Sequence, residues 1–180
     1  MMGTEKMDKT AETNKPKEKK KRIVTETKKW NEHIVSQDEQ YEWLRRLDAP
    51  DQDKQLHFLR DQIQQKINSY KYQDLKKKKY NAELFVTISF VLDLLMKSNL
   101  CCFYCKLPVL LWYDFSREPK QWSLERIDNA FGHNCDNVEI ACLSCNLKRR
   151  CMYFERYRYT KQLVIVKELS KDFAKDSSEK

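Results

Sequence analysis

Between residues 36 and 80, hydrophobic side chains recur at the spacing of α-helices. Ser36 and Glu39 form a capping-box pattern ahead of an apolar run, and Pro50 closes the helix that follows. The spacings of three and four that come next predict a second helix running to about Tyr80. Its apolar stripe, which could dock on the domain expected over residues 101–160 or on a second chain, consists of Leu56, Leu59, Ile63, Ile67 and Tyr70.

The pattern then changes from one further helix to short strands and turns. Thr87 is placed to cap a helix over residues 88–97, which is apolar nearly all round and is therefore expected to be buried. Residues 122–127 and 137–141 read as two strands, with a loop over 128–136 in which Gly132 suits a sharp turn. A helix is expected to begin at Asn146, and a last short strand over 163–166.

Charge and composition divide the chain further. The 35 Lys and Arg residues exceed the 27 Asp and Glu residues and give a net charge of +8, which favours a polyanionic partner. Residues 1–29 hold ten basic and five acidic residues with few apolar ones, so we expect a disordered basic tail. The sequence predicts four parts: this tail, a helical domain or arm over 30–100, a further domain over 101–160, and a short strand with a frayed C-terminal tail over 161–180.

No segment has the character of a signal peptide or a membrane span. Residues 1–29 lack a continuous apolar run, and the longest apolar stretch, residues 84–96, is interrupted by polar side chains. We therefore expect no membrane association and a reducing intracellular compartment, the cytoplasm or nucleus. A disulfide framework is not expected in a reducing compartment, so the seven cysteines require another explanation.

Two CxxC pairs supply that explanation. Cys102 with Cys105 and Cys142 with Cys145 can each present two thiolates to one tetrahedral ion, and four such ligands close a structural zinc site. A redox pair or chance is the alternative for each pair alone. Cys101 could replace Cys102 as a ligand, whereas Cys135 and Cys151 are expected to be ordinary thiols.

Residues 102–150, which contain CFYC, SLERIDNAFGHNCDNVEIACLSC and NLKRR, resemble an HNH nuclease of the ββα-metal superfamily. The similarity is to the four-cysteine subclass of phages and large DNA viruses, and it covers about a quarter of the chain. It implies an α+β fold in which an N-terminal helical region precedes a zinc-stapled ββα-metal finger. It also implies a structural Zn²⁺ on the cysteines, a catalytic Mg²⁺ or Mn²⁺, and, for a viral protein, a place in the host nucleus, virus factory or virion.

The resemblance also assigns roles to single residues. Glu125 matches the acidic ligand of the catalytic ion, Asn146 matches the second ligand, and Asn137 matches a residue that braces the loop. Both proposed ligands carry oxygen atoms suited to a hard divalent ion. Arg126 stands where the family has its histidine general base, and an arginine cannot act as that base because its pKa stays above about 12.

Three interpretations of the Arg126 position remain. His133 in the loop could serve as the base, or a metal-bound water could ionise without a side-chain base while Arg126 steadies a phosphate. In the third interpretation the site is degenerate and only binds nucleic acid. The function that the resemblance implies, and that we favour, is a metal-dependent DNA endonuclease. The alternatives are a zinc-stabilised nucleic-acid-binding protein and, more weakly, a zinc-ribbon subunit that acts through protein contacts.

The segment over 142–167 mixes basic and aromatic residues. Such a mixture can contact the phosphate backbone and stack on bases of double-stranded DNA, or form an amphipathic helix that buries its aromatic side chains. We expect both, with some tyrosines packed and the basic residues facing DNA. The predicted DNA-binding residues are Lys148, Arg149, Arg150, Arg156 and Arg158.

Overall fold

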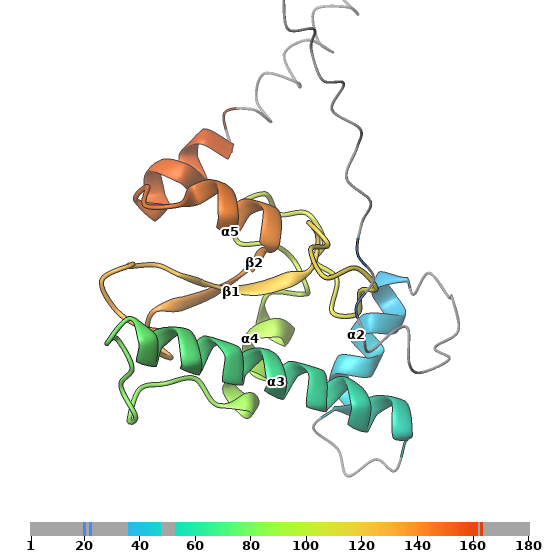
Figure 1. Ribbon diagram of the computed structural model, residues 1–180. Coiled ribbons are helices and arrows are strands. Elements are labelled where there is room, and N and C mark those ends of the chain that lie inside the picture. The colour runs from blue at the N-terminus through green and yellow to red at the C-terminus, as the bar shows by residue number, and fades with distance from the viewer. Residues whose placement is uncertain (1–19, 21, 23–35, 48–52, 162, 164–180) are drawn as a thin grey trace, which may run out of the picture.

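The computed structural model describes residues 20, 22, 36–47, 53–161 and 163, which form a mixed α+β fold (Figure 1). The predicted α+β class is confirmed at this level, while the predicted tail over 1–29 falls almost entirely outside the described residues. The elements are α2 (Gln37–Arg46), α3 (Lys54–Lys76), α4 (Ile88–Lys97), β1 (Trp122–Arg126), β2 (Val138–Cys142) and α5 (Leu143–Arg149). A further helical segment covers residues 154–161.

The first helix begins at the predicted capping box. The Glu39 amide donates to Ser36 Oγ at 3.2 Å, and the Ser36 amide donates to Glu39 Oε2 at 2.8 Å. Gln40 is buried on this helix, and its Oε1 accepts hydrogen bonds from the Leu111 and Trp112 amides. These bonds fasten α2 to the segment that leads into β1, while Pro50 lies outside the described residues.

Helix α3 carries the predicted apolar stripe but ends earlier than expected. Its stripe is buried against the rest of the chain, which confirms the first of the two docking alternatives. The helix stops at Lys76 rather than near Tyr80, because Lys78 adopts a left-handed backbone conformation with a φ of 57°. That turn lets the Lys79 amide donate to the Asp74 carbonyl at 2.8 Å and closes the helix.

Helix α4 confirms its prediction at both ends. Thr87 caps it by accepting a hydrogen bond from the Phe90 amide at 3.2 Å, and the helix runs over Ile88–Lys97. Val91, Leu92 and Leu95 are fully buried on it. This buried face lies between α3 and the strands (Figure 1), whereas Ser89, Asp93 and Lys97 on the opposite side are exposed, so the helix is not buried all round as expected.

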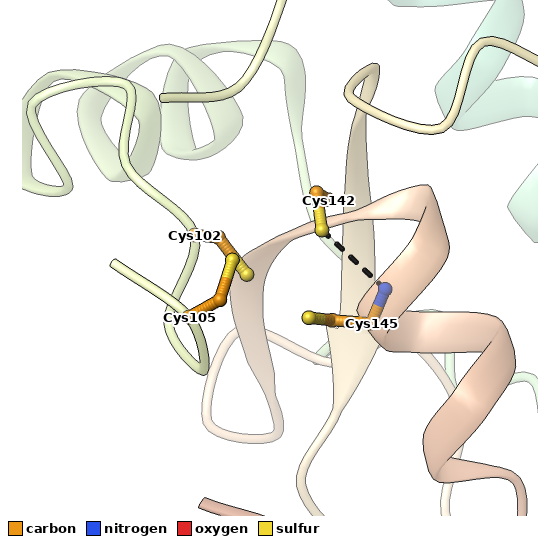
Figure 2. A group of neighbouring side chains, drawn as sticks. All are labelled: Cys102, Cys105, Cys142 and Cys145. Carbon is orange, nitrogen blue, oxygen red and sulfur yellow. Dashed lines mark hydrogen bonds between the residues drawn. The ribbon is translucent and has the colours of Figure 1, made fainter. Parts of the chain in front are cut away.

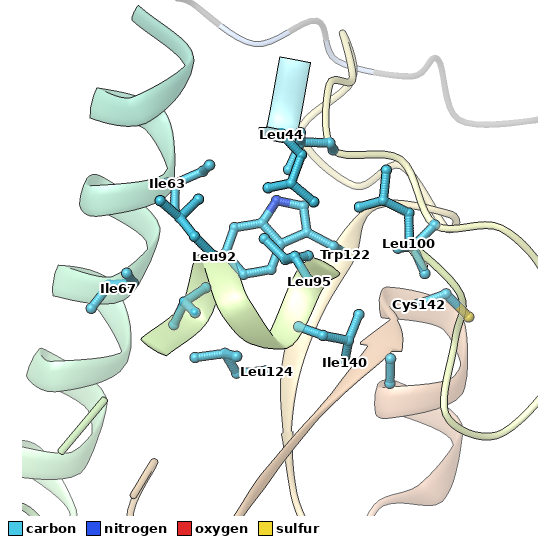
Figure 3. Close-up of a cluster of buried hydrophobic side chains, with 14 of the residues drawn as sticks. Leu44, Ile63, Ile67, Leu92, Leu95, Leu100, Trp122, Leu124, Ile140 and Cys142 are labelled. Atoms are coloured by element: carbon cyan, nitrogen blue, oxygen red, sulfur yellow. The ribbon is translucent and has the colours of Figure 1, made fainter. Parts of the chain in front are cut away.

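Strands β1 and β2 form an antiparallel hairpin with two unlike faces. Trp122 pairs with Cys142 and Leu124 with Ile140, so these side chains share one face, which packs into the core with α3 and α4 (Figure 3). The other face carries Ser123, Glu125, Glu139 and Ala141 and lies toward α5. The hairpin thus separates an apolar core from a polar layer.

The C-terminal part of the described chain differs from the predictions in two places. Helix α5 begins at Leu143, not at Asn146, because the Cys142 thiol acts as its N-cap and accepts a hydrogen bond from the Cys145 amide at 3.4 Å. Of the strand predicted over 163–166, only Leu163 is described, and it is helical.

No helix in the described part of the chain combines the length and hydropathy that a membrane span requires.

Candidate functional site

Four cysteines from two distant segments meet beside the hairpin. Cys102 and Cys105 lie in a turn after α4, the first knuckle (residues 101–106), while Cys142 and Cys145 lie at the junction of β2 and α5. Their sulfur atoms all lie within 4.8 Å of one another, and Figure 2 shows the thiols gathered around one point. Tetrahedral zinc with bonds of about 2.3 Å separates its sulfur ligands by about 3.8 Å, so the cluster fits a structural metal such as zinc.

Backbone hydrogen bonds shape the first knuckle and join it to β2. The Cys102 amide donates to the Leu107 carbonyl and the Lys106 amide donates to the Cys102 carbonyl, with Lys106 in the left-handed region at a φ of 58°. The Phe103 amide donates to the Ile140 carbonyl at 2.7 Å and so docks this turn on β2. The cysteine cluster is therefore built into the fold.

The thiols also influence one another's ionisation. Hydrogen bonds from the Cys142 and Cys145 thiols lower the pKa of Cys102, while the hydrogen bond to Cys102 raises the pKa of Cys145 to about 11. A bound cation would favour the thiolate form of all four. The remaining cysteines, Cys101, Cys135 and Cys151, lie outside the cluster.

Glu125 lies on the polar face of β1 in a buried ion pair. Its Oε1 accepts from Arg149 Nε and from the Tyr104 hydroxyl, the latter at 3.3 Å, and the residue is 2% exposed. Burial raises the pKa of Glu125, and the Arg149 charge opposes that rise. The carboxylate therefore has its charge balanced within the chain.

Arg149 corrects one of the predicted DNA contacts. We expected it to face DNA with Lys148 and Arg150, but it is 3% exposed, because its guanidinium lies against the polar hairpin face. Besides Glu125 it donates to the carbonyls of Arg126 and Met152. Its charge is used inside the fold, whereas the side chains exposed to solvent are those of Lys148, Arg150, Arg156 and Arg158.

The second predicted ligand lies close to the first. Asn146 on α5 donates its Nδ2 to Ser123 Oγ at 3.2 Å and to the Leu124 carbonyl at 3.1 Å, directly before Glu125 on β1. These bonds hold the amide nitrogen against the strand and leave its oxygen as the atom available to a ligand. A carboxylate and an amide oxygen match a hard divalent ion in type, but the Arg149 charge reduces the attraction of Glu125 for any cation.

Asn137 holds the hairpin loop in shape. Its Nδ2 donates to the carbonyls of Asp128 at 2.9 Å and Gly132 at 3.0 Å, and its Oδ1 accepts from the Asp128 amide at 2.8 Å. Arg126 turns to the same loop and donates to the Phe131 carbonyl at 3.2 Å. Both side chains therefore fix the course of the loop beside Glu125.

His133 lies on the α3 side of the loop. Its Nδ1 lies 2.9 Å from Asp74 Oδ1, its amide donates to Asp74 Oδ2 at 2.6 Å, and its ring packs on Tyr70 with centroids 4.5 Å apart. Burial lowers the pKa of His133 to about 4, and Asp74 opposes that shift. The hydrogen-bond partner of the His133 ring is thus Asp74, and within the described residues no hydrogen bond joins His133 to Glu125 or Asn146.

A cleft of about 530 Å³ opens between residues 78–84 and the hairpin loop. Lys78 and Lys79 line it together with Asp128 and Asp136, and the Phe131 ring lies at its edge. Its positive and negative side chains balance, so the cleft offers no concentrated charge for a phosphate.

Two partners of the site were missed at the sequence level. Asp74 carries no local signal, because its partner His133 is 59 residues away. Tyr104 lies inside the first CxxC pair, where only its position between the cysteines could have drawn attention. No protein-family model, curated protein or solved structure matches this chain, so the HNH resemblance depends on the motif residues alone.

Proposed function

We propose that this chain is a metal-dependent DNA endonuclease in which β1, β2 and α5 form an HNH-type ββα-metal finger. The observation that carries the proposal is the bonding of Asn146 to the strand directly before Glu125. These bonds join Asn146 to the strand that carries Glu125, at the junction of hairpin and helix. The four-cysteine cluster at the start of α5 supports the same arrangement.

The proposed reaction is hydrolysis of a phosphodiester bond. When bound, a divalent ion supplies positive charge for the pentacovalent phosphate and the leaving oxygen. In this chain Glu125 and Asn146 would hold that ion, and the exposed Lys148 and Arg150 would hold the DNA backbone. Asn137 would keep the loop in place without touching substrate.

The position of His133 bears on the choice of base. Its low pKa leaves the imidazole neutral at pH 7, as a general base must be, but the ring is bonded to Asp74 on the side away from α5. This favours the interpretation without a side-chain base, in which Arg126 steadies a phosphate. His133 as the base stays a prediction.

A second candidate function is nucleic-acid binding without cleavage. It is favoured by the ion pair between Glu125 and Arg149, since a carboxylate that already has a buried counter-ion attracts a metal ion less. In this case the exposed basic residues would still bind DNA, and the affinity would fall steeply with salt concentration.

A nicking assay separates the two candidates. Supercoiled and branched DNA would be incubated with Mg²⁺ or Mn²⁺ and with wild type, Glu125→Gln, Asn146→Ala and Glu139→Gln. Glu139 is the matched control, because it pairs with Glu125 across the hairpin on the same face but lies near Lys106. We expect a loss of at least about 100-fold in the first two variants and none in the third.

The result that contradicts the endonuclease is wild-type protein that binds DNA without nicking it. Calorimetric titration with Mn²⁺ then tests the site directly. Heat of binding that disappears in Glu125→Gln supports a catalytic ion, whereas no heat with wild type supports the binding protein. Circular dichroism of each variant checks that the fold is retained.

A further inference from the structure

Tyr157 is buried in a helical segment whose other tyrosine is exposed. It is 6% exposed, whereas Tyr159 on the same segment is 62% exposed. Its hydroxyl is one of two buried side-chain polar atoms in the described chain that have no hydrogen-bond partner. A buried hydroxyl without a partner is destabilising, so a compensating acceptor is expected.

The surroundings of this hydroxyl are the cysteine cluster. The Tyr157 ring packs edge-on against Tyr104, with centroids 4.8 Å apart, and Tyr104 lies between Cys102 and Cys105 in the first knuckle. Burial raises the pKa of Tyr157, and the neighbouring Cys145 thiol raises it further. The Tyr157 ring therefore packs beside the first knuckle, whose two cysteines are prospective metal ligands.

A metal-bound cysteine is a thiolate, and a thiolate accepts hydrogen bonds where a neutral thiol accepts them weakly. We propose that the Tyr157 hydroxyl donates a hydrogen bond to the metal-bound Cys145 sulfur. This bond would fasten the helical segment 154–161 to the metal centre. Partners of this kind around metal ligands affect metal affinity in many proteins. The inference rests on the four-cysteine centre and is independent of nuclease activity.

The bond has a consequence for nucleic-acid binding. Arg156 and Arg158 are exposed on either side of Tyr157, and the Arg158 guanidinium lies 5.7 Å from the centre of the Phe103 ring. A segment held by Tyr157 has these two charges fixed relative to the cysteine cluster. The metal centre would then position part of the basic surface as well as the hairpin.

The test compares Tyr157→Phe with Tyr159→Phe in the full chain. Both changes remove one hydroxyl and keep the ring, so packing against Tyr104 is preserved in the first variant. With Co²⁺ as the probe, we expect the sulfur-to-metal charge-transfer band to shift in Tyr157→Phe only. Release of Zn²⁺ to a chelator should be about 10- to 100-fold faster in that variant, and amide exchange over 154–161 should be faster as well.

Equal spectra and equal release rates for wild type and Tyr157→Phe would overturn the proposal. Faster amide exchange with an unchanged Co²⁺ spectrum would also overturn it, because it would show a packing role without a bond to sulfur. Neither result depends on the nicking assay. A protein that binds no Co²⁺ or Zn²⁺ at all would refute the metal centre and this inference together.

Discussion

Two charged side chains determine the character of the polar hairpin face. Glu125 and Arg149 are both buried, and each is acceptable in the interior only because the other is present. Arg149 also satisfies the carbonyls of Arg126 and Met152, so one side chain joins the strand, the loop start and the end of α5. The pair therefore explains why a basic helix packs on a strand that carries a carboxylate.

Removing one partner should be more damaging than removing both. Arg149→Met leaves Glu125 buried without its counter-ion, and we expect a loss of about 3–5 kcal/mol in the free energy of unfolding. The double variant Glu125→Gln with Arg149→Met should lose less than the sum of the single changes. Urea unfolding of metal-loaded protein measures both, with Lys148→Met on the exposed side of α5 as the control. Strictly additive losses would mean that the pair is not coupled.

The burial of His133 predicts a pH dependence of stability. The folded pKa of His133 is about 4 against an ordinary 6.5, so the unfolded chain takes up a proton first as the pH falls. The free energy of unfolding should therefore decrease between about pH 6.5 and pH 4. His133→Asn, which keeps a nitrogen near Asp74, should remove this part of the pH dependence. His57→Asn, an exposed site on α3, should leave the wild-type slope, and an unchanged slope in His133→Asn would contradict the assignment.

At the scale of elements, the loop between the strands is held by close contact. We expected Gly132 to serve a sharp turn, but it does not adopt a positive φ. A Cβ at this position would lie 2.5 Å from the Lys79 carbonyl oxygen and 2.8 Å from Asp74 Oδ2. The missing side chain therefore lets the loop approach the end of α3.

Gly132→Ala should destabilise the protein by separating the loop from α3. The clash involves a backbone oxygen that cannot rotate away, so we expect a loss of about 1–3 kcal/mol in the free energy of unfolding. Thermal unfolding measures it, with Ala130→Ser at an exposed position of the same loop as the control. A melting temperature equal to that of wild type would show that the loop can move aside.

Signals from neighbouring residues predicted most of these elements. The α2 capping box, the Thr87 cap and the alternation in β1 each involve residues a few positions apart. The end of α3 and the start of α5 could not be predicted in this way. The first depends on the left-handed conformation of Lys78, which its residue type does not signal, and the second on Cys142 acting both as a cap and as a member of the cysteine cluster.

Prediction of the candidate site had the same limit. The cysteine cluster followed from two short spacings, and the choice of Asn146, which lies against β1, followed from the resemblance to HNH nucleases. The burial of Arg149 was missed because it depends on a carboxylate 24 residues earlier. Contacts across the fold decide which charged residues face solvent, and a single sequence does not contain that information.

In the whole molecule, one core joins the helices to the hairpin. Leu44 of α2, Ile63 of α3 and Leu95 of α4 belong to the same buried cluster as Trp122 and Cys142 (Figure 3). Cys142 thus belongs to the core and to the cysteine cluster at once. Loss of a metal from the cysteine cluster should therefore destabilise the helices as well as the hairpin.

Loss of the metal should abolish cooperative unfolding of the chain. A structural zinc contributes about 10–16 kcal/mol in small zinc-binding domains, which equals or exceeds the total stability of about 5–15 kcal/mol that is usual for proteins. We expect one zinc per chain in wild type and in Cys151→Ser, the exposed control, and none in Cys102→Ser or Cys145→Ser. Elemental analysis and thermal unfolding test this. A sharp transition in the metal-free variants would mean that the shared core folds without the ion.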